Sequence, residues 1–258
     1  MKNRKRNKLN QILLQWPANG LRTASFLRAQ GISSSLLNHY ARRRWLERVE
    51  RGLYRRPGDT PGWPAALLAI QKEEGLPIHA GGLTAIELQG YGHYTGERPL
   101  FLYSSKHTRL PAWFKGAANR KVYFVPSNFL GNPKQDSLHS VVEEGISIVT
   151  STPERAALET LYHVPRQVGF IEATEIVGGL AVVRVELMQS LLESCASVKV
   201  KRLFLYCARE AGHAWFRTLD QSRIRLGAGK RELVKGGKLD KEYLLTVASK
   251  PFATEARF

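Results

Sequence analysis

The 258-residue sequence is poor in cysteine and has no long apolar run. Cys195 and Cys207 are its only cysteines, too few for a disulfide framework and without the C-x-x-C spacing of zinc or redox motifs. Apolar stretches fall short of the roughly 18 to 20 residues that cross a bilayer, and the N-terminal one is too short for a secretory signal. We therefore expect a cytoplasmic protein with no membrane partner.

Acidic residues are scarce in the first part of the chain. Residues 1–58 carry 14 basic and 2 acidic side chains, a formal charge of +12, out of +17 for the whole sequence. The remaining 200 residues carry 25 basic and 20 acidic side chains, or +5. A basic surface kept for solubility alone would spread its charge evenly. Charge concentrated in a small N-terminal unit instead indicates binding to nucleic acid.

The N-terminal sequence predicts two helices joined by a tight turn. Thr23 can cap a helix that ends at Gly31, and Ser33 or Ser34 can cap the next. Apolar residues stand at positions −4, +1, +6 and +9 relative to Gly31, the spacing by which the two helices of a helix-turn-helix pack together. The outer face of the second helix then carries Ser34, Ser35, Asn38, His39, Arg42 and Arg43.

The segment after the second helix predicts a β-hairpin. Apolar and charged residues alternate between Leu46 and Tyr54, and Gly52 can adopt the positive φ of a tight turn. A hairpin in this position is the wing of a winged helix. Its tip and outer edge carry Arg48, Arg51, Arg55 and Arg56. Residues 1–58 are therefore predicted to be a winged helix-turn-helix DNA-binding domain.

The rest of the chain is mixed. A stretch rich in proline and glycine, 55–64, indicates a linker, and residues 62–258 are predicted to form a larger mixed α/β domain. Strands are expected in 98–105, 120–127 and 144–151, and helices dominate afterwards. The predicted fold class is α+β, an N-terminal winged helix-turn-helix followed by a larger C-terminal domain.

Three local predictions concern the chain ends and one helix start. Ser151 and Glu154 have the spacing of a capping box, with Pro153 suited to the first turn. A final hairpin is expected around Gly236–Gly237. Residues Met1–Lys8 are expected to be a mobile basic arm.

The chain resembles the AbiEi family, the antitoxins of type IV toxin–antitoxin systems. The resemblance covers nearly the whole length. It rests on the block "GISSSLLNHYARRRWLERVERGLYRRPG", on "HAGGLTAIELQGY" with "STPERAALETL", and on "VKVKRLFLYCAREAGHAWFRTLDQSRIRLGAGKRELVKGGKLDKEY". The third block is the most distinctive, because winged helices are common.

The resemblance implies a bacterial protein that binds double-stranded DNA and represses its own operon through inverted repeats in the promoter. It also implies that the C-terminal domain counters a nucleotidyltransferase-like toxin, without a stable complex being required. A preformed dimer or two monomers meeting on DNA would both fill inverted repeats, so we expect a monomer or a weak dimer on DNA.

In a helix-turn-helix the second helix enters the major groove and its N-terminal part reaches the base edges. Base contacts are therefore expected from Ser34, Ser35, Asn38 and His39. Arg42 and Arg43 on the helix are expected to contact phosphate, with guanine as the alternative. Arg51 and Arg55 on the wing are expected over the adjacent minor groove or the backbone, and Arg22 and Thr23 at the start of the preceding helix are expected to meet phosphate. The alternative for each is a solvated side chain with no role.

Signals for catalysis are weak. The segment Gly227–Glu232, "GAGKRE", fails the phosphate-loop pattern because Ile224 and Arg231 stand where Gly and Ser or Thr belong. Gly90–Gly96 misses a dinucleotide-binding pattern by one residue. The histidines show no metal-ligand spacing. We expect no catalytic residues, no metal and no cofactor.

Two questions stay open at this level. One alternative function is a nuclease or nucleotidyl-processing effector that the winged helix delivers to DNA. The other concerns a second group of basic residues, which form either a solvated face or a second basic surface: Lys201, Arg202, Lys230, Arg231, Lys235 and Lys238.

Overall fold

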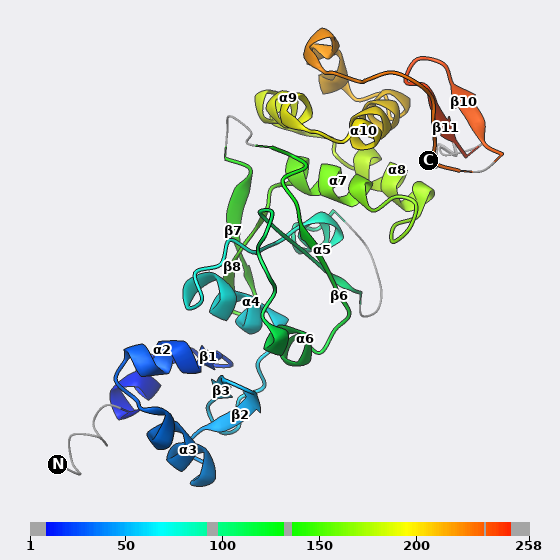
Figure 1. The fold of residues 1–258 in the computed structure, drawn as a ribbon. Helices are drawn as coiled ribbons and strands as arrows, with labels where there is room; N and C mark the ends of the chain where they lie inside the picture. The colour runs from blue at the N-terminus through cyan, green and yellow to red at the C-terminus, as the bar shows by residue number, and fades with distance from the viewer. Residues whose placement is uncertain (1–8, 92–97, 132–135, 235, 249–258) are drawn as a thin grey trace, which may run out of the picture. The chain divides into compact units, whose positions relative to one another are not determined.

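A computed structural model describes residues 9–91, 98–131, 136–234 and 236–248. The chain divides into two compact units (Figure 1). The first comprises Met1–His79, Glu97–Pro126 and Ser140–Val149, and the second comprises Ala80–Gly96, Ser127–His139 and Thr150–Phe258. The basic arm Met1–Lys8, most of the loop Gly90–Gly96 and Lys235 lie outside the described residues.

The first unit begins with a winged helix-turn-helix. Residues 9–14 are helical, and α2 (Ala24–Ala29) and α3 (Ser34–Arg42) follow. The wing is the antiparallel pair β2 (Glu47–Glu50) and β3 (Leu53–Arg55), with β1 (Arg22–Thr23) on the other side of β3. Their shared core consists of Leu9, Trp16, Leu27, Ile32, Leu37, Tyr40, Leu46 and Tyr54. The predicted winged helix and the apolar positions that build it are confirmed.

The turn between α2 and α3 depends on one glycine. Gly31 adopts φ +83°, a conformation that other residues rarely adopt. This lets the Gly31 amide bond the Arg28 carbonyl at 2.8 Å and the Ile32 amide bond the Leu27 carbonyl at 3.0 Å. Leu27 and Ile32 are both buried, completing a Schellman motif with its apolar contact. The turn thereby sets the direction in which α3 leaves α2.

A five-stranded sheet follows, with the strand order β6-β5-β4-β8-β7. Its strands are β4 (His79–Ala80), β5 (Leu100–Ser104), β6 (Val122–Pro126), β7 (Leu138–Glu143) and β8 (Ile146–Ser151). The pairs β5–β6 and β4–β8 are parallel. All five residues of β5 are buried, as expected of a parallel strand covered on both faces. The helices α4 (Trp63–Lys72) and α6 (Ala112–Ala118) belong to the first unit.

The second unit is mainly helical, as predicted. It contains α5 (Gly82–Leu88), α7 (Pro153–Tyr162), α8 (Phe170–Gly178), α9 (Val185–Ser194) and α10 (Val198–Glu210). Two 3-10 helices follow, η1 (Ala214–Thr218) and η2 (Gln221–Arg223), and then β9 (Arg231–Glu232), β10 (Lys238–Asp240) and β11 (Leu245–Val247). The apolar face of α10 is fully buried, so α10 lies at the centre of this unit.

The capping box predicted at the start of α7 is wrong. Thr152, not Ser151, is the N-cap residue, and its side chain makes no capping bond. The Ser151 hydroxyl donates instead to the buried Glu159 carboxylate at 2.7 Å, and Glu154 binds Arg184. Both polar side chains satisfy tertiary partners, because a buried carboxylate left without donors is costlier than an uncapped helix end. The expected Pro153 does occupy the first turn.

The predicted C-terminal hairpin is also misplaced. The chain turns at Gly236, at φ +69°, but the antiparallel pair is β10 with β11, joined through residues 241–244. Strand β9 pairs parallel with β11. Gly237 serves a different purpose, because the Val247 carbonyl leaves no room for a Cβ atom there. Close backbone approach, rather than turn formation, accounts for the second glycine.

Candidate nucleic-acid interface

Helix α3 presents a polar face to solvent. It begins at Ser33, whose hydroxyl accepts from the Leu36 amide at 3.3 Å. Leu37 and Tyr40 are buried and attach the helix to the core. The residues predicted to face outward are all exposed, and the structure brings them together on α3 and its C-cap: Ser34, Ser35, Asn38, His39, Arg42 and Arg43.

The wing is tied to α3 by one arginine that the sequence patterns did not single out for this role. From β2, Arg48 donates to the Asn38 side-chain oxygen at 2.9 Å and to the Tyr54 hydroxyl at 3.3 Å. Its guanidinium also lies 5.7 Å from the centre of the Tyr54 ring. Asn38 is thus held by its oxygen, with its amide N–H groups left to point elsewhere. Ten residues separate Arg48 from Asn38, so the contact becomes visible only in the folded structure.

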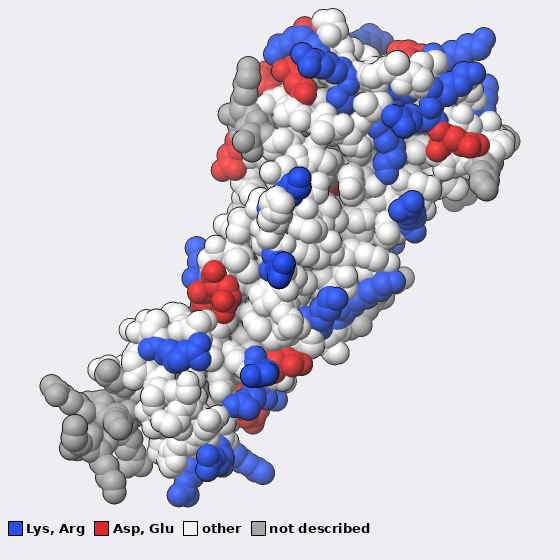
Figure 2. All heavy atoms as spheres, viewed as in Figure 1, with Lys and Arg blue, Asp and Glu red and all other residues white. Residues whose placement is uncertain are grey.

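The arginines of this region fall into two groups. Arg55 donates to Glu47 at 2.8 Å and Arg56 to Asp59 at 3.0 Å, so both carry a carboxylate partner. By contrast, Arg42, Arg43 and Arg51 are exposed and form neither ion pairs nor hydrogen bonds with any side chain in the described part of the chain. Figure 2 shows basic side chains at the end of α3 and over the wing. Unpaired guanidinium groups need no exchange of partner before they bind phosphate.

The start of α2 is occupied by a carboxylate. The Thr23 amide donates to Glu73 at 2.6 Å and Arg22 pairs with the same carboxylate at 2.7 Å, while the Thr23 hydroxyl caps α2 by accepting from the Phe26 amide. Glu73 is the C-cap residue of α4, and its carboxylate occupies the place at the start of α2 where a DNA phosphate was expected. Burial raises the Glu73 pKa above its ordinary value, although the Thr23 amide and Arg22 oppose that rise.

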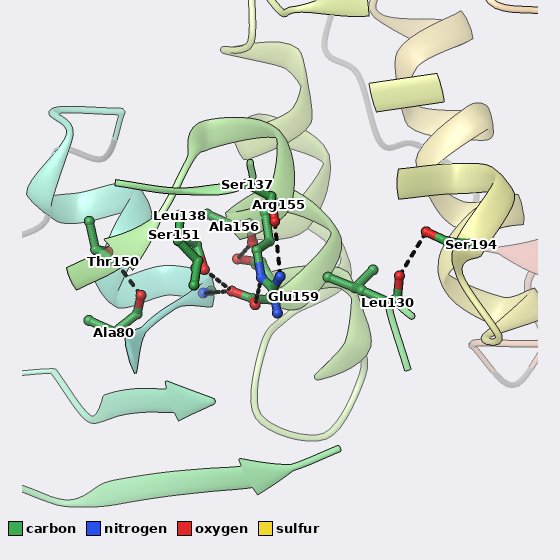
Figure 3. A network of polar contacts seen from close by, with 12 residues as sticks. Ala80, Leu130, Ser137, Leu138, Thr150, Ser151, Arg155, Ala156, Glu159 and Ser194 are labelled. Atoms are coloured by element: carbon green, nitrogen blue, oxygen red, sulfur yellow. Dashed lines mark hydrogen bonds and ion pairs between the residues drawn. The ribbon is translucent and has the colours of Figure 1, made fainter. Parts of the chain in front are cut away.

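A second polar cluster lies in the other unit and is buried (Figure 3). Glu159 is fully buried and accepts from the Gly82 amide at 3.0 Å, the Ser151 hydroxyl at 2.7 Å and Arg155 at 2.7 Å. Arg155 donates further to the Ser137 hydroxyl at 3.0 Å. One carboxylate thereby joins α5, β8 and α7. The cluster is shielded from water and its donors are matched to its acceptors, as in a structural network.

Glu154 forms a neighbouring contact. Its carboxylate accepts from the Arg184 backbone amide at 2.9 Å and from the Arg184 guanidinium at 3.0 and 3.1 Å. Burial would raise the Glu154 pKa, but the hydrogen bonds from Arg184 outweigh it and hold this pKa below its ordinary value. This ion pair connects the first turn of α7 to the residue that precedes α9.

The described residues lack the features of two other classes of protein. No helix among them is long and apolar enough to cross a membrane. Within the same residues, no group of three or more histidine, cysteine or acidic side chains is arranged to hold a metal ion.

Comparison with known proteins identifies the family. Residues 5–96 match the model of the AbiEi antitoxin N-terminal domain, and residues 97–248 match the model described as "Transcriptional regulator, AbiEi antitoxin, Type IV TA system". The crystal structure of the RV2827C protein from Mycobacterium tuberculosis is similar, with a TM-score of 0.56 at 16% identity, covering 88% of this chain and 85% of that one. That likeness shows a shared fold. The search of curated proteins found no match. The chain belongs to the AbiEi family of transcriptional regulators, the antitoxins of type IV toxin–antitoxin systems.

Proposed function

We propose that this protein is a sequence-specific repressor that binds inverted repeats in its own promoter through the winged helix of residues 1–58. The observation that carries the proposal is the exposed polar face of α3, flanked by the unpaired Arg42, Arg43 and Arg51. In a winged helix this face is the one that enters the major groove. Unpaired cations on both sides of it lie where the phosphate backbones pass.

The N-terminal half of α3 carries the base contacts in this proposal. Ser34 and Ser35 have hydroxyls that donate or accept, and His39 offers a ring nitrogen. Asn38 is held through its oxygen by Arg48, so its amide N–H groups are the part available to a base acceptor. A two-bond contact to adenine would require Arg48 to release the Asn38 oxygen first.

The arginines carry the phosphate contacts. Arg42, Arg43 and Arg51 bind phosphate directly, whereas Arg55 exchanges Glu47 for phosphate. Arg22 and Thr23 contribute least, because a phosphate would have to displace Glu73. If six groups on the protein neutralise phosphates, the logarithm of the binding constant falls with the logarithm of salt concentration with a slope of roughly −5.

The antitoxin function is assigned to residues 62–258. Membership in the AbiEi family supports a role in opposing a toxin, and we propose a nucleotidyltransferase-like toxin that this domain counters without a stable complex. The protein would act in the cytoplasm, where its operon lies, as a monomer or a weak dimer on DNA.

The test is a fluorescence anisotropy titration of the full-length protein against its own upstream region and against a scrambled duplex, at several salt concentrations. We expect the native sequence to bind at least about a thousandfold more tightly than the scrambled one. Asn38→Ala should reduce this preference, because it removes a side chain that faces the bases. Arg51→Ala should weaken binding to both duplexes and make the salt slope shallower by about 1.

Arg217→Ala is the control for loss of one positive charge, since Arg217 is exposed on η1 in the other unit. It should leave both the preference and the salt slope unchanged. Equal affinity of the wild-type protein for the two duplexes would contradict the repressor proposal. The winged helix would then be a domain that binds nucleic acid without sequence preference.

A further inference from the structure

The loop Arg225–Arg231 between η2 and β9 is organised by a buried arginine. Arg202 on α10 is only 1% exposed, and its guanidinium donates to three carbonyls of this loop: Leu226 at 2.9 Å, Gly227 at 3.0 Å and Gly229 at 2.6 Å. The sequence predicted Arg202 to be part of either a solvated face or a second basic surface. The structure instead makes it the internal support of the loop.

This support fixes the direction of the loop's amide groups. In a trans peptide the N–H of one residue points opposite to the carbonyl of the residue before it. Because the carbonyls of Leu226, Gly227 and Gly229 point at Arg202, the N–H groups that follow them point away from it: those of Gly227, Ala228 and Lys230. None of the three donates to a main-chain oxygen of the described residues, and Gly227, Ala228 and Lys230 are exposed.

The two glycines make this arrangement possible. Gly227 and Gly229 adopt φ +64° and +77°, which residues with a Cβ atom rarely adopt. A Cβ on Gly227 would also lie 3.1 Å from a methyl carbon of Val198. Successive outward amides in a glycine-rich loop form an anion-binding concavity, even without the strand and helix that flank a phosphate loop in nucleotide-binding enzymes.

The cations around the loop lack acidic partners. Lys201, Arg225, Lys230 and Arg231 form no ion pair with any carboxylate among the described residues, and Figure 2 shows basic side chains gathered over α10 and the C-terminal strands. Other arginines of this unit do have such partners. Arg209, for example, pairs with Glu210, Asp240 and Glu242.

Lys201 differs from the other cations of this group in its low exposure. It is only 4% exposed, yet no side chain in the described part of the chain neutralises it. Burial lowers the Lys201 pKa, Cys195 opposes that shift, and the nearby charge of Arg225 adds to it. No carboxylate among the described residues pairs with Lys201, so an anion bound at the loop would supply a counter-charge that the described chain does not.

We infer that the loop Arg225–Arg231, together with Lys201, is a binding site for a phosphate group. The outward amides would hold the phosphate oxygens, and the unpaired cations would neutralise their charge. Two sources share this chemistry, the phosphates of a free nucleotide and those of a nucleic-acid backbone.

Isothermal titration calorimetry on the full-length protein tests the inference, with sodium tripolyphosphate as one probe and a scrambled DNA duplex as the other. Lys230→Ala should weaken phosphate binding roughly tenfold, the loss of one charge-assisted hydrogen bond. Lys201→Met should weaken it without lowering Tm, because Lys201 has no ion-pair partner to lose among the described residues. Ala228→Pro removes one outward N–H group while leaving every charge in place, and should weaken binding as well.

Lys241→Ala is the matched control, an exposed lysine between β10 and β11 and outside the loop. Loss of tripolyphosphate binding in Lys230→Ala but not in Lys241→Ala supports a small-anion site. The same pattern seen only with the duplex supports a backbone phosphate site. If both lysine variants weaken each probe equally, or neither does, the site does not exist. Asn38→Ala should leave tripolyphosphate binding unchanged, because Asn38 lies outside the loop. The phosphate site can therefore be tested independently of the repressor proposal.

Discussion

Two sets of arginines, one on the winged helix and one in the helical unit, are used in opposite ways. At the end of α3 and the wing tip, Arg42, Arg43 and Arg51 face water and have no side-chain partner among the described residues. In the helical unit, Arg155 and Arg184 bind buried carboxylates. The same residue type therefore serves as a surface cation in one region and as an internal crosslink in the other. What decides between them is whether the fold brings an acceptor within reach.

The difference has an energetic consequence. An internal crosslink is costly to break from either side, since removal of one partner leaves the other buried and unsatisfied. An exposed, unpaired arginine adds little to folding stability, so its loss should appear in binding alone. Stability and DNA affinity should thus respond to substitutions in different regions.

The largest expected effect is at Glu159. Glu159→Ala leaves the Gly82 amide, Ser151 and Arg155 without their shared acceptor, so unfolding free energy should fall by about 3 to 5 kcal/mol. Urea denaturation followed by circular dichroism measures this loss. Glu175→Ala, which removes an exposed glutamate of α8, should cost less than about 0.5 kcal/mol. Similar losses in the two variants would show that the buried network contributes nothing special.

The next effect is a dependence of stability on pH. The folded-state pKa of Glu154 is lowered, so the stability it contributes is present above its unfolded pKa of about 4.3 and disappears as pH falls through the folded value. Denaturation midpoints of the wild-type protein should therefore fall more steeply below that pH than those of Glu154→Gln. At neutral pH the substitution should cost roughly 1.5 to 3 kcal/mol, the range for a hydrogen bond to a charged group. If the stability of the wild-type protein and that of Glu154→Gln change with pH in parallel, the Glu154–Arg184 pair is not the source of the pH dependence.

Arg48 is an exception to the contrast between surface arginines and internal crosslinks, because it belongs to the wing yet holds Asn38 and Tyr54. Arg48→Ala frees the Asn38 oxygen and removes the contact with Tyr54. We expect stability to fall by about 1 kcal/mol, with a change in sequence preference at the base that Asn38 faces. Binding to a panel of operators with single base changes would detect it. A uniform loss over the panel would mean that Arg48 binds phosphate and does not orient Asn38.

The smallest expected effect is a difference in the salt dependence of DNA binding between variants of two wing arginines. Arg51→Ala should make the salt slope of DNA binding shallower by about 1, whereas Arg55→Ala should change it by less, since Arg55 already has Glu47 as a partner. Titrations in increasing salt with both variants measure the difference. If Arg55→Ala has the larger effect, the Glu47 pair opens readily and pairing in the free protein does not predict phosphate contact.

Much of the winged helix could be predicted because its signals are local. Thr23, Ser33 and Gly31 lie within a few residues of the backbone groups that they satisfy, and the apolar spacing follows from helix geometry. The outward face of α3 followed from the same spacing. The capping box of α7 failed for the opposite reason, because Ser151 and Glu154 found partners elsewhere in the chain.

The sequence by itself determined where α2 and α3 begin, which of their faces are buried, and where positive charge is concentrated. Only the tertiary structure decided which charges remain available. Glu73 reaches Thr23 across 50 residues, and Arg202 reaches Gly229 across 27. Partners so far apart leave no periodic signal. A charge becomes a ligand site or a crosslink according to what the folded chain places beside it, because pairing depends on distance in space.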